Sequence, residues 1–93
     1  MRLFRRGTEA ASAPLSLRLL SRPGCHLCDE MKARLDPIAR DAGISVSVVN
    51  VDLDAGLRAR WGDEIPVLLD AEDRLVAKGR DPEAKIRRRL LSR

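Results

Sequence analysis

The sequence predicts a single α/β domain with the element order βαβαββα, in which a four-stranded mixed sheet is flanked by helices. A chain of 93 residues has room for only one hydrophobic core. The spacing of its apolar residues changes several times between the period of two typical of strands and the period of about 3.6 typical of helices. Glycine, proline or a cluster of polar residues stands where most of those changes fall.

Residues 15–21 form the first expected strand, because their leucines alternate with polar residues before two leucines become adjacent. The Arg-Pro-Gly run at residues 22–24 ends this strand. From Leu27 onward, apolar residues follow at intervals of four and three, which places them on one face of a helix. Gly43 lies just beyond the expected end of this helix, and Pro37 is expected to kink it.

Residues 46–51 contain four valines and predict a second, buried strand. It is expected to run parallel to the first strand, because a connection through a helix is normally a right-handed crossover between parallel strands. Asp54 then has the character of an N-cap for a short helix that contains Leu57 and Trp61 and ends at Gly62.

Residues 66–69 and 75–77 are expected to form two more short strands. The polar residues 71–74 separate them, and so short a connection favours an antiparallel hairpin.

Asp81 and Pro82 predict the start of the last helix, with Asp81 as its cap and Pro82 at its first position, where the missing N–H costs nothing. This helix is expected to end near Leu91, with Ile86 and Leu90 on its apolar face.

Residues 1–14 are expected to be a flexible tail in front of a domain that spans residues 15–93. The tail lacks the ~7–15 apolar residues of a secretory leader, and no apolar run approaches the ~20 residues of a membrane helix. We therefore expect a cytoplasmic protein with no membrane partner.

The net charge of +4 is distributed as basic ends around an acidic middle. Arginine is preferred over lysine, which the base composition of the gene explains as well as a function would. The arginines at residues 87–89 are consecutive and fan around a helix, and aromatic residues make up only 2% of the chain. We therefore do not expect a nucleic acid as the partner.

The two cysteines, Cys25 and Cys28, stand where the first strand meets the first helix. In a cytoplasmic chain such a pair more often indicates redox or metal chemistry than a structural disulfide. N–H groups at a helix start carry about half a positive charge, which stabilises a thiolate on Cys25. Cys28, one turn later, is expected to be more buried and to attack a mixed disulfide held on Cys25.

Charged neighbours act on Cys25 in both directions. Arg22 and a protonated His26 favour its thiolate, whereas Asp29 and Glu30 oppose it. We therefore expect only that the pKa of Cys25 lies below its ordinary value of about 8.5.

Two other interpretations of the cysteine pair remain open. One is a pair of buried, inert cysteines, which the Cys-x-x-Cys spacing after Pro-Gly makes the minority interpretation. The other is zinc binding, for which Cys25, His26 and Cys28 supply at most three neighbouring ligands, whereas a structural zinc site uses four. We therefore predict no metal site within one chain.

The element order, with Cys25-His26-Leu27-Cys28 opening the first helix and Ile65-Pro66 opening the third strand, resembles the thioredoxin fold and its glutaredoxin branch. Residues 21–25 (Ser-Arg-Pro-Gly-Cys) are similar to the glutaredoxin entry to the active site, with Arg in place of the usual Lys. The resemblance covers residues 15–91, and residues 24–29 resemble more specifically a group of small bacterial glutaredoxin-like proteins.

The resemblance implies that Cys25 is the nucleophile and Cys28 the resolving thiol of a redox-active disulfide. It implies a cis bond before Pro66, which guides the substrate and leaves the backbone of Ile65 free to pair with it. Arg22 and His26 are the implied substrate-binding residues beside Cys25.

A further part of the implied substrate site lies at residues 78–81 (Lys-Gly-Arg-Asp). Glutaredoxins usually carry a Gly-Gly-Cys/Ser-Asp turn there, which holds the γ-glutamyl end of glutathione. This chain keeps only Gly79 and Asp81 of that turn, although Lys78 and Arg80 could attract a carboxylate. It also has His-Leu between its cysteines instead of the usual Pro-Tyr.

The leading hypothesis is a dithiol oxidoreductase of cell redox homeostasis that acts on a disulfide-containing protein or a glutathione mixed disulfide. No bound cofactor is expected, and glutathione is a candidate reductant. One alternative is a non-catalytic module of the same fold that senses redox state or binds a partner. Another is a metal or iron–sulfur carrier that bridges two chains through Cys25.

Overall fold

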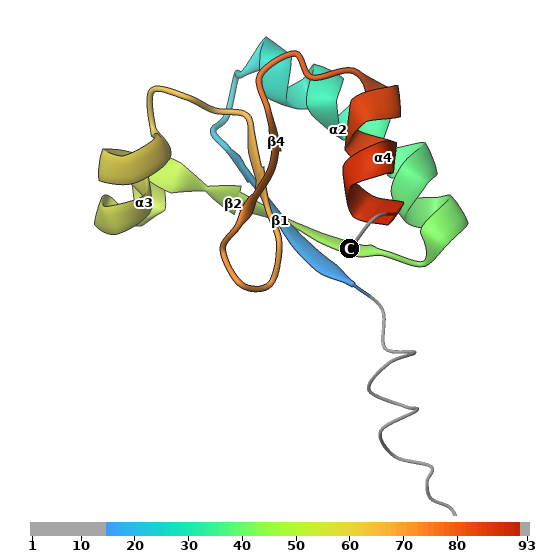
Figure 1. Cartoon of the computed structure of the whole chain (residues 1–93). Helices are drawn as coiled ribbons and strands as arrows, with labels where there is room; N and C mark the ends of the chain where they lie inside the picture. The colour runs from blue at the N-terminus through green and yellow to red at the C-terminus, as the bar shows by residue number, and fades with distance from the viewer. Residues whose placement is uncertain (1–14, 92–93) are drawn as a thin grey trace, which may run out of the picture.

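The computed structural model describes residues 15–91 (Figure 1). The expected flexible tail, residues 1–14, therefore lies outside the described residues, as do residues 92–93. The described elements are β1 Ser16–Ser21, α2 His26–Ala42, β2 Ser45–Asn50, the 3₁₀ helix η1 Val51–Leu53, α3 Ala55–Trp61, β3 Val67–Leu69, β4 Leu75–Lys78 and α4 Glu83–Leu91.

The four strands form one mixed sheet in the order β2-β1-β3-β4. β1 runs parallel to β2, with Ser16 opposite Ser45 and Ser21 opposite Asn50. β3 runs antiparallel to both β1 and β4. The predicted α/β class, with its four-stranded mixed sheet, parallel crossover and antiparallel hairpin, is confirmed.

Helices cover both faces of this sheet. α2 and α4 pack side by side on one face (Figure 1), and α3 lies on the other. Successive strand residues point to opposite faces, so Leu19 belongs to the core under α2 and α4, whereas Leu20 belongs to the smaller cluster on the α3 side. On α2 the spacing of four and three residues turns Met31, Leu35 and Ile38 onto the sheet, as the periodicity predicts.

Short-range signals account for most helix ends. Gly43 ends α2 in the left-handed region with φ +67°, and the helix continues without a break through Pro37. The side chain of Asp54 accepts a hydrogen bond from the backbone N–H of Leu57 at 3.0 Å, which confirms it as the N-cap of α3.

The end of β2 differs from the sequence-based expectation. Val51 begins the 3₁₀ helix η1 instead of continuing the strand. The side-chain oxygen of Asn50 accepts a hydrogen bond from the backbone N–H of Asp52 at 2.9 Å and turns the chain there.

The start of α4 also differs, because Asp81 is not its cap. The helix begins at Glu83, and the carbonyl of Pro82 accepts hydrogen bonds from the N–H groups of Lys85 and Ile86 at 3.0 and 3.1 Å. The carboxylate of Asp81 instead accepts from the backbone N–H of Lys78 at 3.1 Å and from the ammonium of Lys85 at 3.2 Å. The backbone N–H of Asp81 also bonds to the carbonyl of Lys78. This bond closes a turn just before the helix and brings the Asp81 side chain back toward Lys78.

A buried carboxylate organises the hairpin between β3 and β4. Asp70 is 1% exposed and accepts hydrogen bonds from the backbone N–H groups of Glu72 and Arg74, both at 2.9 Å, and from Nε of Arg74 at 3.0 Å. Burial, the largest influence, favours a higher pKa for Asp70. The hydrogen bonds from Arg74 and Glu72 outweigh it and hold the pKa below its ordinary value.

Asp70→Asn is expected to lower the free energy of unfolding by about 1–3 kcal/mol at pH 7, because it removes charge-assisted hydrogen bonds from a buried site. A carboxyl whose folded pKa is depressed stabilises the fold above its ordinary pKa, about 3.9, and loses that contribution as the pH falls through the folded pKa. Urea unfolding at pH 7 and near pH 2–3 should therefore show that the difference between variant and wild type shrinks in acid.

Asp73→Asn in the same turn is the matched control. Asp73 is largely exposed and pairs with Arg18 on the surface, and Asn tolerates its positive φ, so a loss below about 1 kcal/mol is expected. Equal losses in the two variants, or a difference for Asp70→Asn that does not shrink in acid, would contradict this account.

Candidate active site

The residues before Cys25 form a tight turn that joins β1 to α2. The backbone N–H of Cys25 bonds to the carbonyl of Arg22 at 3.3 Å, so residues 22–25 form a β-turn with Pro23 second and Gly24 third. Gly24 has φ +80°, which is typical of the third position of a type II turn. A Cβ there would meet nothing within 4 Å, so space would allow a side chain. Glycine is favoured at this position because of its positive φ.

This turn places Cys25 at the N-cap of α2. Its backbone is extended, with φ −89° and ψ 103°, and its Sγ accepts a hydrogen bond from the backbone N–H of Cys28 at 3.2 Å. An N-cap side chain normally offers an oxygen to such an N–H, and here a sulfur takes that place. The sulfur is thereby exposed to the partial positive charge of the helix start, as the sequence predicts.

Cys25 and Cys28 are joined by a disulfide, with their Cα atoms 5.2 Å apart. Cys28 is only 2% exposed and packs in the interior, whereas Cys25 is half-buried. The expectation that Cys28 is the more buried of the two is confirmed. Solvent therefore reaches the pair from the side of Cys25.

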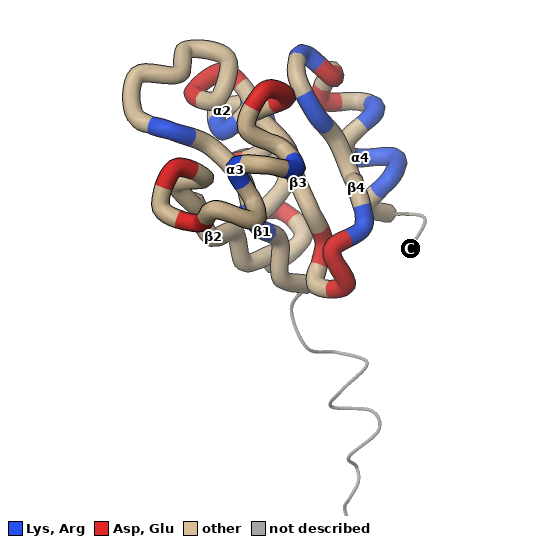
Figure 2. Tube along the Cα trace, turned by 90° about the vertical axis from the view of Figure 1, so that its left-hand side faces the viewer, with Lys and Arg blue, Asp and Glu red and all other residues tan. Residues whose placement is uncertain are grey.

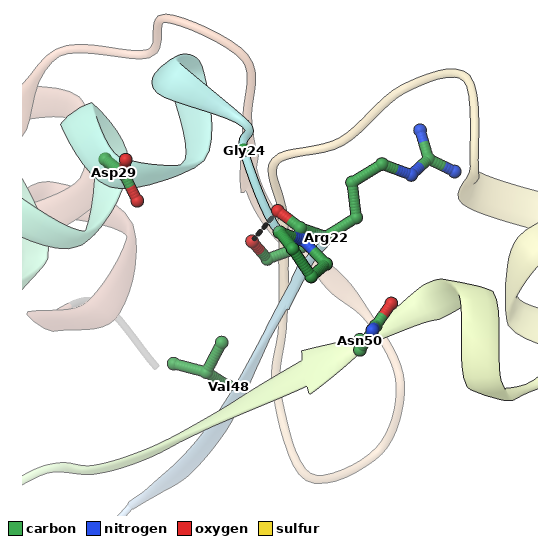
Figure 3. Close-up of a pocket in the computed structure, with 7 residues that line it drawn as sticks. Arg22, Gly24, Asp29, Val48 and Asn50 are labelled. Carbon is green, nitrogen blue, oxygen red and sulfur yellow. Dashed lines mark hydrogen bonds between the residues drawn. The ribbon is translucent and has the colours of Figure 1, made fainter.

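Arg22 is held by groups on the far side of the turn. Its guanidinium makes a two-pronged ion pair with the carboxylate of Asp52, at 2.8 and 3.0 Å, and also donates to the carbonyl of Gly62 at 3.2 Å. This hydrogen-bonded pair lowers the pKa of Asp52. Figure 3 shows the Arg22 side chain extending away from Gly24 and Asp29.

The pairing reduces the help that Arg22 can give to a thiolate on Cys25, because Asp52 offsets its charge. Sequence reasoning did not identify Asp52 as this partner. The two residues lie 30 positions apart, and no local pattern links them.

Pro66 lies near the turn of residues 22–25, which we call the cysteine turn. The peptide bond between Ile65 and Pro66 is cis. Because Leu20 pairs with Val67, the next residues along the two strands, Ser21 and Pro66, lie at the edge of the sheet where the cysteine turn begins. Within residues 15–91, neither backbone group of Ile65 makes a hydrogen bond.

The segment after β4 is tied to Pro66 by the backbone N–H of Gly79, which donates to the carbonyl of Pro66 at 2.9 Å. Gly79 has φ +60°, and its own carbonyl accepts from the guanidinium of Arg34 at 3.2 Å. Arg34, on α2, is a second residue that sequence reasoning did not identify. The structure thus brings Pro66, Gly79 and the turn containing Asp81 together.

Asp81 and Lys78, in the segment implied for substrate binding at residues 78–81, already have partners, whereas Arg80 is exposed. Burial, the largest influence, favours a higher pKa for Asp81, but its bonds to Lys78 N–H and to Lys85 outweigh it and lower the pKa. The ammonium of Lys78 pairs with Glu64 at 2.5 Å. His26 is exposed at the first position of α2, next to Cys25.

Basic residues gather on α4 and at the end of β4 (Figure 2). Arg87 pairs with Glu83 at 3.0 Å and with Asp41 at 3.7 Å, and Arg89 donates to the carbonyl of Val76 at 2.8 Å. These cations are therefore largely engaged by neighbouring groups of the same domain.

No group of three or more His, Cys, Asp or Glu among residues 15–91 is arranged to hold a metal ion. In the same part of the chain, no helix has the length and apolar character needed to cross a bilayer.

The family model of the glutaredoxin-like domain (DUF836) matches residues 16–91. Among relatives, an uncharacterized protein of Mycobacterium tuberculosis is 34% identical over 58 residues, which cover 57% of this chain and 60% of that protein. The chain thus spans about 60% of the length of the curated relatives that it matches first.

Two solved structures resemble the chain over most of its length. A structural genomics target from X. campestris is 31% identical with a TM-score of 0.70, over 83% of this chain and 97% of that one. The germline-specific thioredoxin Deadhead from Drosophila melanogaster is 23% identical with a TM-score of 0.65, over 96% and 90% of the two chains. This likeness to a thioredoxin confirms the expected thioredoxin-like fold.

In the reduced protein, Cys25 is expected to titrate below about 8.5 and Cys28 above it, because the helix start stabilises one thiolate and burial disfavours the other. Thiolate absorbance measured against pH in Cys28→Ser and Cys25→Ser reports each sulfur alone. A value for Cys25 at or above about 8.5 would contradict the assignment.

Proposed function

The chain belongs to the glutaredoxin-like domain family, and from that premise we propose that it is a thiol–disulfide oxidoreductase acting on protein or small-thiol disulfides. The observation that carries the proposal is a half-buried sulfur at the start of α2, hydrogen-bonded to a helix N–H and joined to a buried sulfur one turn later. This arrangement gives one accessible nucleophile and one protected resolving group.

The first step is attack by the thiolate of Cys25 on a substrate disulfide. A bond forms between Cys25 Sγ and one substrate sulfur, and the other substrate sulfur leaves as a thiolate that takes a proton from solvent. The N–H of Cys28 that contacts Sγ in the disulfide can hold the attacking thiolate in the same place. The product is a mixed disulfide between substrate and protein.

The second step resolves this mixed disulfide. Cys28 loses its proton and attacks Cys25 Sγ, so the disulfide between Cys25 and Cys28 forms and the second substrate thiol leaves. Two electrons have then passed from the protein dithiol to the substrate. Cys28 lies within bonding reach of Cys25 Sγ, and its burial keeps external disulfides away from it.

An external thiol must return the two electrons before the next cycle. We propose a low-molecular-weight thiol such as glutathione, or a protein dithiol, and no bound cofactor. A reducing cytoplasm would supply either donor, and we propose it as the working location.

The segment around Pro66 supports a role in substrate alignment. The N–H and carbonyl of Ile65 lack hydrogen-bond partners within residues 15–91, and they lie beside the turn that carries Cys25. An extended substrate backbone could pair with both groups and bring its sulfur toward Cys25. In this proposal His26, exposed beside Cys25, contacts the same substrate.

Cys25→Ser is expected to abolish turnover of a small neutral disulfide, because it removes the attacking sulfur. Cys28→Ser is expected to retain the first step and accumulate the mixed disulfide, which intact-mass measurement detects. The assay couples either glutathione or a thioredoxin system as electron donor and compares their rates.

The pair of serine variants also separates the alternative functions. Full turnover by Cys25→Ser would sink the proposed mechanism. A wild-type pair that oxidises yet shows no turnover with either donor would favour a redox-sensing or partner-binding module. Colour or zinc that co-purifies and is lost in Cys25→Ser would favour a metal or iron–sulfur carrier.

A further inference from the structure

A pocket lies beside the cysteine turn, on the side facing β2 (Figure 3). It is lined by residues 21–24 of the turn, Asp29 from α2, and Val48 and Asn50 from β2. Because β2 and β3 lie on opposite sides of β1, this pocket and Pro66 flank the cysteine turn from opposite sides. A disulfide that reached Cys25 along Ile65 and Pro66 would have this pocket on the far side of the turn.

The charge that the pocket presents is negative. Figure 3 shows that Asp29 points into the pocket, whereas the guanidinium of Arg22 points away from it, toward its partners Asp52 and Gly62. Within residues 15–91, the Asp29 carboxylate has neither an ion pair nor a side-chain hydrogen bond. The lining residues from β2, Val48 and Asn50, carry no charge, and Arg22, which also lines the pocket, is paired with Asp52.

The rest of the lining suits a short aliphatic group. Val48 is 54% exposed, although it lies on the sheet face that α2 and α4 otherwise cover. Asn50 uses its side-chain oxygen to accept from Asp52 N–H, and its amide N–H₂ has no partner among the described residues. Apolar surface next to one uncompensated carboxylate fits an alkyl arm that ends in a cation.

Resting on the proposed function, we propose that this pocket selects disulfides that carry a cationic group close to the sulfur. An ammonium or guanidinium in the pocket would face Asp29, while its alkyl arm covers Val48. An anionic disulfide would meet Asp29 and would find Arg22 already bound by Asp52. Small aminothiol disulfides and protein disulfides with a neighbouring Lys or Arg share this chemistry.

The test measures the first exchange step in reduced Cys28→Ser, which stops at the mixed disulfide. Its substrates are three disulfides of similar size: cystamine (cationic), hydroxyethyl disulfide (neutral) and dithiodipropionate (anionic). Each rate is divided by the rate of free mercaptoethanol with the same disulfide, which removes the intrinsic reactivity of the reagent. Stopped-flow oxidation of reduced wild type by the same reagents provides the measurement if the serine variant folds poorly.

The normalised preference for the cation over the anion is expected to be about three- to tenfold at low salt, and to fall toward one in 1 M salt. Asp29→Asn should remove most of it. That change also affects the thiolate of Cys25, but a thiolate effect alters all three rates alike and cancels in the ratio. Asp41→Asn, at the other end of the same helix, removes an equal charge and should leave the preference unchanged.

Peptide disulfides that differ only in Lys or Glu next to the cysteine distinguish the two substrate sources. A preference in these peptides supports a protein substrate, and a preference confined to cystamine supports a small aminothiol. A normalised cation-to-anion ratio of about one in Cys28→Ser, or a preference that Asp29→Asn leaves intact, would overturn the proposal. Failure of multiple turnover would instead overturn the proposed function, since the selectivity is read from a single exchange.

Discussion

The hydrogen bond from the backbone N–H of Cys28 to Cys25 Sγ is the contact on which the rest of the site depends. It exists because a type II-like turn ends β1 and starts α2 within four residues, so that a cysteine falls at the N-cap. The sheet core then fixes α2, since Met31 and Leu35 pack against the leucines of β1. The position of Cys25 Sγ is therefore set by the same burial that stabilises the domain.

Arg22 adds a second constraint of a different kind. Its guanidinium joins three separate segments: the cysteine turn, η1 through Asp52, and the end of α3 through Gly62. The pair is 36% and 41% exposed, so solvent screening leaves it only a small contribution to stability. Its effect is mainly geometric, because a two-pronged arginine–carboxylate contact fixes orientation. It also directs the charge of Arg22 away from Cys25 and toward Asp52.

Sequence reasoning succeeded where the information lies within a few residues. The strand and helix periods, the Asp54 cap and the placement of Cys25 at a helix start are all local patterns. It did not predict hydrogen-bond partners that only the folded chain brings together. Asp81 was expected to cap α4 but bonds to Lys78 instead, and the partnership of Arg22 with Asp52 spans 30 residues. Local propensity does not predict these side-chain partners, because they depend on how the elements pack.

Asp29 connects the chemistry of the cysteine pair with its electrostatics. In the first turn of α2 an acid stabilises the helix start by about 0.3–1 kcal/mol, but it also disfavours a thiolate on Cys25. Since the disulfide carries no charge, this repulsion acts only on the reduced form. Destabilising the reduced form lowers the reduction potential. Asp29 thereby moves the pair toward a stronger reductant, opposite to the helix N–H groups. A cationic substrate group next to Asp29 would offset the repulsion while the thiolate attacks, so one carboxylate would favour both the electron transfer and the substrates that receive it.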